Sequence, residues 1–191
     1  MFPDSVDKIR QQRYNADIMK NIIDRDLGPS IRDFHLPGYS EIPDVGLYLE
    51  QTTKYVNSFF HAFPDMTLTP SMVSNYVKKG IVPNPVRKQY YRDQIAYLIY
   101  ICVIKVSMSM DNIGLMLRLQ QATYSLDVAY EYFRQELENV LGYVFGVKDA
   151  LDNIGVESSE QKILLRKAII AAAHKMYLEK YFAVLKDGAD E

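Results

Sequence analysis

Five basic side chains are concentrated in residues 69–92, a stretch that contains no acidic side chain. The parts of the chain before and after it carry formal net charges of -3 and -4, against -2 for the whole protein, so the positive charge is local. A local positive segment on a mildly acidic protein is typical of a surface that faces a polyanion such as nucleic acid. The five basic residues are Lys78, Lys79, Arg87, Lys88 and Arg92.

The first half of this segment predicts a short helix with two different faces. Thr69 is a suitable N-cap, Pro70 suits the first helical position, and Gly80 suits the residue just past the end. Asparagine pairs well with adenine, lysine with guanine or phosphate, and serine with either. We therefore expect the polar face to contact DNA, and the alternative is an ordinary solvated helix face. The polar face has the spacing i, i+3, i+4, i+7 and is formed by Ser71, Ser74, Asn75 and Lys78.

The second half of the segment predicts a hairpin, or wing, near residues 81–91, because it holds two prolines among β-prone residues. Basic residues alternate there with tyrosines, which suits a strand that contacts a sugar–phosphate backbone. The alternative is a solvated basic turn. The contacts expected from this half come from Arg87, Lys88, Tyr90 and Arg92. With Lys79 at the end of the helix and the four residues of its polar face, nine residues are expected to contact DNA.

Hydrophobic periodicity predicts a mainly α-helical protein around this segment. The helix over residues 93–106 is nearly all apolar, and the helix over 159–185 is apolar around most of its circumference, which indicates burial on every side. The expected helices cover residues 6–27, 45–63, 70–79, 93–106, 110–121, 125–147 and 159–185, and the serines before three of them suit N-caps.

The sequence offers little for catalysis or metal binding. It contains no Gly-rich phosphate loop, no His-Glu-x-x-His motif and no nucleophile elbow. The single cysteine, Cys102, excludes an internal disulfide and lies in the apolar helix, where we expect it to fill the core. The histidines His35, His61 and His174 are too far apart for a compact ligand motif. We therefore expect no enzymatic activity, no cofactor and no metal.

The chain is also expected to lie in the cytoplasm without contacting a membrane. The longest uncharged apolar stretch, residues 95–104, falls well short of the roughly 18 to 20 residues that a membrane-spanning helix needs. The first ten residues lack the apolar core of a signal peptide.

The last two predicted helices are candidates for self-association. Their neighbours can cover only part of the apolar surface of residues 159–185, and a two-fold interface between two copies would cover the rest. We expect His174 to lie in the core or in that interface. Five tyrosines could line an effector pocket in this region, namely Tyr130, Tyr132, Tyr143, Tyr177 and Tyr181.

Residues 74–83 resemble the end of the recognition helix and the following turn of the mercury-resistance-regulator (MerR) winged helix-turn-helix. Tyr90 matches the tyrosine that opens the next helix of that family, and Lys88 matches a wing arginine. Residues 109–113 are similar to the family's Ser-Leu-Glu-Glu-Ile helix start. With residues 36–37, 42–44 and 47–48, the pattern resembles more closely an uncharacterised bacterial domain of unknown function that is regarded as MerR-like. The resemblance covers about residues 36–119.

The resemblance implies three parts: an N-terminal helix and connector (1–39), a MerR-like winged helix-turn-helix domain (40–121), and a C-terminal helical region for dimerisation or effector binding (122–191). We therefore predict a transcriptional regulator that binds duplex DNA as a homodimer through its C-terminal helices. A winged-helix module that binds another protein is the alternative, and an unrecognised enzyme is the third option. Carboxylate partners for the basic residues would favour the alternative.

Overall fold

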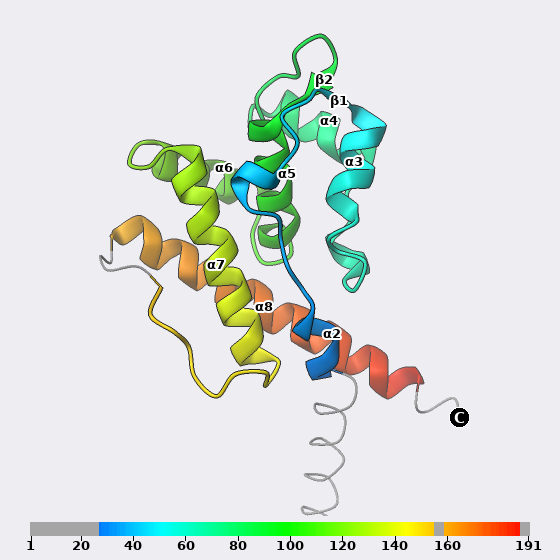
Figure 1. The fold of residues 1–191 in the computed structure, drawn as a ribbon, viewed down its shortest axis with the longest axis vertical. Coiled ribbons are helices and arrows are strands. Elements are labelled where there is room, and N and C mark those ends of the chain that lie inside the picture. Colours follow the sequence, from blue (N-terminus) through cyan, green and yellow to red (C-terminus); the bar gives the residue numbers. More distant parts are fainter. Residues whose placement is uncertain (1–26, 155–158, 188–191) are drawn as a thin grey trace, which may run out of the picture.

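The computed structural model describes residues 27–154 and 159–187, which form a mainly helical structure with one small antiparallel sheet (Figure 1). The predicted helix over residues 6–27 lies outside the described residues except for its last position. Two single-turn 3₁₀ helices, η2 and η3, lie in the connections at Tyr39–Glu41 and Pro64–Met66. The helices are α2 (Gly28–Arg32), α3 (Leu49–Asn57), α4 (Pro70–Lys78), α5 (Arg92–Ile104), α6 (Met110–Gln121), α7 (Leu126–Val144) and α8 (Glu160–Asp187).

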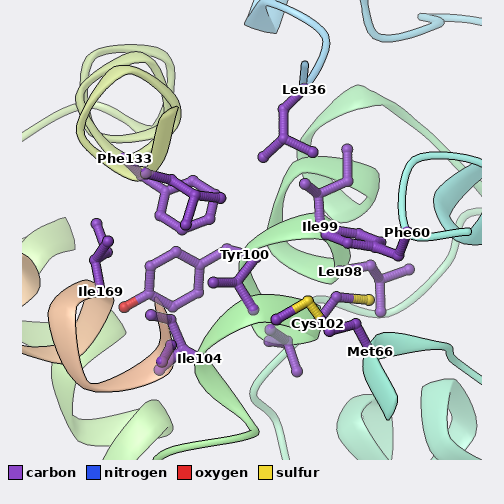
Figure 2. Packing of buried hydrophobic residues seen from close by; sticks show 14 of the residues in the cluster. Leu36, Phe60, Met66, Leu98, Ile99, Tyr100, Cys102, Ile104, Phe133 and Ile169 are labelled. Atoms are coloured by element: carbon purple, nitrogen blue, oxygen red, sulfur yellow. The ribbon is translucent and has the colours of Figure 1, made fainter. Parts of the chain in front are cut away.

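Helix α5 is the centre of the core. Every residue from Gln94 to Ile104 is buried, and α5 contacts α3, α7 and α8. Figure 2 shows Tyr100 on the side of Phe133 and Ile169, which belong to α7 and α8, while Leu98, Ile99 and Cys102 lie toward Phe60 and Met66. The prediction of a buried apolar helix is therefore confirmed, but the helix ends at Ile104 and not near residue 106 as expected. Because α5 has neighbours on all sides, it joins the part of the molecule around α3 and α4 to the pair α7 and α8.

Serine and threonine caps fix the starts of three helices as the sequence predicts. The Thr69 hydroxyl accepts a hydrogen bond from the Met72 amide at 3.2 Å at the start of α4. Ser109 caps α6 in the same way, and Ser159 caps α8. A side-chain acceptor at the N-cap satisfies one of the four amides that have no partner inside the helix. These local signals explain why the starts of α4, α6 and α8 agree with the prediction.

The sheet differs from the expected hairpin because it uses residues before α3. Strand β1 (Leu47–Tyr48) pairs antiparallel with β2 (Gln89–Tyr90). On the other side of β2, Val86 forms an isolated antiparallel bridge with Gln89. Residues 47 and 48 are extended, so α3 begins at Leu49 and not near residue 45 as expected. The helix also ends early, at Asn57, whose side chain exchanges two hydrogen bonds with the Leu68 backbone, at 2.7 and 2.9 Å.

Helix α8 is buried on one face only, which corrects the expectation of burial on every side. Leu165, Ile169 and Met176 face α7 and the core. On the opposite face, Leu178 and Phe182 are about half exposed, at 51% and 53%. The monomer therefore leaves a large part of the apolar surface of α8 in contact with solvent.

Candidate nucleic-acid interface

Helix α4 has the two faces that the sequence predicts. Val73 and Tyr76 are buried and dock the helix against its neighbours. The Asn75 side chain makes no hydrogen bond within the described residues, so both its donor and its acceptor are free to bind a base edge. Ser74 donates its hydroxyl to the Pro70 carbonyl at 3.0 Å, and its oxygen still has acceptor capacity. The exposed face carries Ser71, Ser74, Asn75 and Lys78.

The tip of the hairpin is a two-residue turn formed by Arg87 and Lys88. Val86 and Gln89 exchange two backbone hydrogen bonds of 2.9 Å across it. Both tip residues have positive φ, 50° and 68°, as a type I′ turn requires. Glycine and asparagine are the usual residues in such turns because other side chains cost about 1–2 kcal/mol each in the left-handed region. Backbone strain of this kind clusters at functional sites, and here it holds two exposed basic side chains at the outermost point of the hairpin.

One helix holds the exposed face of α4 and the hairpin tip in fixed relation. Helix α3 contacts α4, β1 and β2. Figure 1 shows α4 and the hairpin at one end of the molecule, while α8 crosses the opposite part. The approach of the strands also depends on Gly46, because a Cβ there would lie 2.8 Å from the side chain of Gln89. The sheet therefore fixes the orientation in which the hairpin presents its basic tip.

Two of the nine predicted contact residues are engaged inside the structure, which corrects their assignment. Tyr90 is 4% exposed, and burial raises the pKa of its hydroxyl. Arg92 donates from Nε to the Ile42 carbonyl at 2.9 Å and lies 3.7 Å from the Asp44 carboxylate. Its guanidinium also lies 5.7 Å from the centre of the Tyr39 ring, a cation–π contact. Tyr90 therefore belongs to the core, and Arg92 fastens the connector to the start of α5.

The remaining basic residues are solvent-facing. Lys79 lies 3.6 Å from Asp111, and both side chains are well exposed, at 45% and 91%. An exposed pair of this kind contributes little and is readily exchanged for another anion. In the part of the chain that the structure describes, Lys78, Arg87 and Lys88 form no ion pair. This end of the molecule therefore offers three cations without a carboxylate partner among the described residues. Lys79 is a fourth cation, and its pairing with Asp111 is weak.

Cys102 is buried in α5, where the sequence predicts that it fills the core. Burial raises the pKa of the Cys102 thiol to about 12, so the thiol stays protonated at neutral pH. No group of His, Cys, Asp and Glu side chains suitable for a metal ion occurs in residues 27–154 and 159–187. His174 is exposed in the monomer, so the expectation of a core histidine is wrong and an interface position stays a prediction.

The five tyrosines of the predicted effector pocket do not converge. Tyr130 is buried and donates its hydroxyl to the Pro37 carbonyl at 3.0 Å. Tyr177 stacks on Tyr181 with the ring centres 6.0 Å apart, and Tyr143 is exposed. A cavity of about 630 Å³ lies elsewhere, between the loop after α3 and α8, and none of the five tyrosines lines it. No local sequence pattern indicates it, because its two walls are more than a hundred residues apart in the chain.

The described residues form a mainly helical protein, in which the small sheet contacts helices α3 and α5. Residues 37–133, about half of the chain, match the model of the family described as Domain of unknown function (DUF1836), so the chain belongs to that family. The match spans the sheet and helices α3 to α6, and it ends within α7. Comparison with curated proteins and with solved structures gave no match. Among the described helices, none combines the length and apolarity required to cross a bilayer.

Proposed function

We propose that this protein binds duplex DNA through the exposed face of α4 and the hairpin tip. The observation that carries the proposal is the presence of Lys78, Arg87 and Lys88 without carboxylate partners among the described residues, at the end of the molecule that also exposes Asn75. Phosphate contacts supply most of the affinity of such an interface, and base contacts supply its specificity.

We also propose that residues 40–121 form a winged helix-turn-helix domain of the MerR type, with its helix-turn-helix and wing in residues 45–91. The support is the chain order of β1, α3, α4, the Val86–Gln89 hairpin and β2, with β2 lying between β1 and Val86. In that arrangement α4 is the recognition helix and the hairpin is the wing. The connection between α3 and α4, residues 58–69, is longer than the tight turn of the motif, and Asn57 bridges it through its bonds to Leu68.

The roles within the interface follow from side-chain chemistry. Asn75, with an unoccupied amide, is suited to a bidentate contact with adenine in the major groove, and Ser71 and Ser74 accept or donate beside it. Lys78 at the end of α4 is suited to guanine or phosphate. Arg87 and Lys88 at the wing tip are suited to the phosphate backbone, which positions the helix without reading sequence.

We further propose that two copies pair through the exposed face of α8, as a transcriptional regulator in the bacterial cytoplasm would require to read a palindromic site. Leu164 and Leu178 on this face are 43% and 51% exposed. Seven-residue spacing is typical of paired helices. The stripe is symmetric about its midpoint near residues 174 and 175, so it is self-complementary between antiparallel copies related by a two-fold axis. It consists of Leu164, Ala171, Leu178 and Leu185.

The test is selection of bound duplexes from a random DNA pool, followed by binding measurements on the selected sequence. The wild-type chain is expected to enrich one sequence and to bind it far more tightly than the starting pool. A variant with Lys78, Arg87 and Lys88 all changed to Gln is expected to lose binding. Lys167→Gln, which removes one exposed charge from α8, is the matched control and is expected to bind as the wild type does. Failure of the wild-type chain to bind any duplex at low salt would refute the proposal.

A protein-binding winged helix is the second candidate. The observation that favours it is the pairing of Arg92 with Asp44 and of Lys79 with Asp111, which leaves the DNA-facing end less positive than the sequence alone indicates. The same selection separates the two candidates, because a protein-binding module would enrich no DNA sequence.

A further inference from the structure

A groove of about 630 Å³ lies between the loop after α3 and the C-terminal half of α8. One wall comes from residues 61–66, which include η3, and the other from residues 175–186. Pockets that bind small molecules typically measure about 300 to 1,000 Å³. The volume therefore suits a small organic ligand, and none of the lining residues belongs to the exposed face of α4.

The interior of the groove is apolar, whereas its rim is charged. Phe63, Met66 and Met176 line it and are almost fully buried, at 6%, 1% and 4% exposed. The charged lining comprises three lysines against two carboxylates, a net charge of +1 when His61 is neutral. The charged residues are Lys175, Lys180, Lys186, Asp65 and Glu179.

Lys180 lies over the apolar surface of the groove. Its ammonium donates to the Ala62 carbonyl at 3.3 Å and lies 5.5 Å from the centre of the Phe63 ring. It forms no ion pair within the described residues, although an ammonium has three hydrogens to donate. Desolvation by the surrounding side chains lowers its pKa. A partly desolvated cation with donors to spare is stabilised by an anion.

We propose that this groove binds an amphipathic organic monoanion, a molecule with an apolar body and a single carboxylate. The carboxylate pairs with the ammonium of Lys180, and the apolar body lies on Phe63, Met66 and Met176. The net charge of the lining balances one negative charge and no more, which favours a monocarboxylate over a polyanion. This site stands independently of DNA binding, since it shares no residue with the proposed interface.

The experiment is isothermal titration calorimetry on the full chain with three matched probes below the concentration at which they aggregate. Octanoate has both the charge and the apolar body, octanol lacks the charge, and acetate lacks the body. We expect one octanoate per chain, and at least about tenfold weaker binding of both other probes. Octanol loses a hydrogen bond to a charged group, which contributes about 1.5 to 3 kcal/mol, and acetate loses the burial of the alkyl chain, about 0.8 kcal/mol per CH₂. Equal binding of octanol and octanoate, or no binding of octanoate, would overturn the proposal.

Two variants and one control locate the site. Lys180→Met keeps the apolar stem and removes the ammonium, and it is expected to weaken octanoate at least about tenfold. Ala183→Trp fills the groove from an exposed position on its wall and is expected to abolish binding. Lys167→Met lies on α8 outside the groove and is expected to bind octanoate as the wild type does. Thermal melting verifies that each variant is folded, and unchanged affinity in both groove variants would refute the assignment.

A second copy of the chain is the competing occupant of the groove. Light scattering with and without octanoate separates the two, because a ligand of the groove should leave the molecular mass unchanged. Conversion of a dimer to a monomer by octanoate, or by Ala183→Trp alone, would show that a partner chain covers the groove and would overturn the proposal.

Discussion

Replacement of Arg87 and Lys88 by Asn and Gly should make the protein more stable and a weaker DNA binder at the same time. The two residues occupy a type I′ turn with φ of 50° and 68°, and Asn-Gly is the pair that this turn favours. The left-handed conformation costs a non-glycine residue about 1–2 kcal/mol, and part of the gain is offset by the larger entropy that glycine loses on folding. We expect a net stabilisation of about 1 kcal/mol, or about 2–4 °C in Tm for a chain of this size.

The same double substitution removes two of the three unpaired cations of the proposed interface. For duplex DNA, the slope of log K against log salt is about -0.9 for each phosphate neutralised. Contacts from Lys78, Arg87 and Lys88 predict a slope near -2.7 per protomer for the wild-type chain, and the variant should retain about -0.9. Fluorescence anisotropy over a range of salt concentrations measures the slope, and urea unfolding measures the free energy.

A second variant with Gln at both positions separates the two effects. It removes the same charges and retains the strained backbone, so its salt slope should equal that of the Asn-Gly variant while its stability stays near that of the wild type. A destabilised Asn-Gly variant would contradict the type I′ turn. An unchanged salt slope in either variant would show that the hairpin tip does not touch DNA.

Four single substitutions test base reading by α4, the α8 interface and two buried polar groups. Asn75→Ala should lose on the order of 1 to 3 kcal/mol of discrimination at one base position on a binding array, and a uniform loss over all sequences would show that α4 does not read bases. Leu178→Lys should convert a dimer into a monomer by light scattering, and a wild-type monomer at micromolar concentration would refute the α8 interface. The Tyr100 hydroxyl is buried without a partner among the described residues, so Tyr100→Phe should stabilise the fold by about 1 kcal/mol in urea unfolding, whereas a loss would reveal an unseen partner. The buried Glu136 carboxylate lies 2.9 Å from the Arg166 guanidinium, but the two groups are not aligned for a hydrogen bond. Desolvation raises the pKa of the Glu136 carboxyl above the usual 4.5. The folded state therefore binds more protons than the unfolded state at intermediate pH. The wild type should gain stability relative to Glu136→Gln as the pH falls from 7 toward 4.5. A difference in unfolding free energy between the two proteins that does not change with pH would contradict the raised pKa.

Local signals were sufficient to predict much of the helical structure. The caps at Thr69 and Ser109 act through hydrogen bonds to amides three residues ahead, so the residues that decide a helix start are adjacent in the sequence. The apolar run before residue 105 is uninterrupted, and burial of α5 follows because only a position inside the core can cover such a helix on all sides.

Long-range pairing explains what the sequence did not predict. The start of α3 depends on β1, which forms only because residues 89–90 pair with it across a large separation in the chain. Tyr90 and Arg92 looked like contact residues because their partners, among them Asp44, lie on a distant segment. The positive φ of Arg87 and Lys88 had no local signal, since neither residue type favours that region.

NMR titration of the isotope-labelled full chain with a duplex at low salt would locate the proposed DNA interface. We expect backbone amide shifts to change mainly in residues 71–78 and 86–89, and the exposed face of α8 in residues 164–178 to be unaffected. Changes confined to α8, or no changes at any duplex concentration, would contradict the proposed interface.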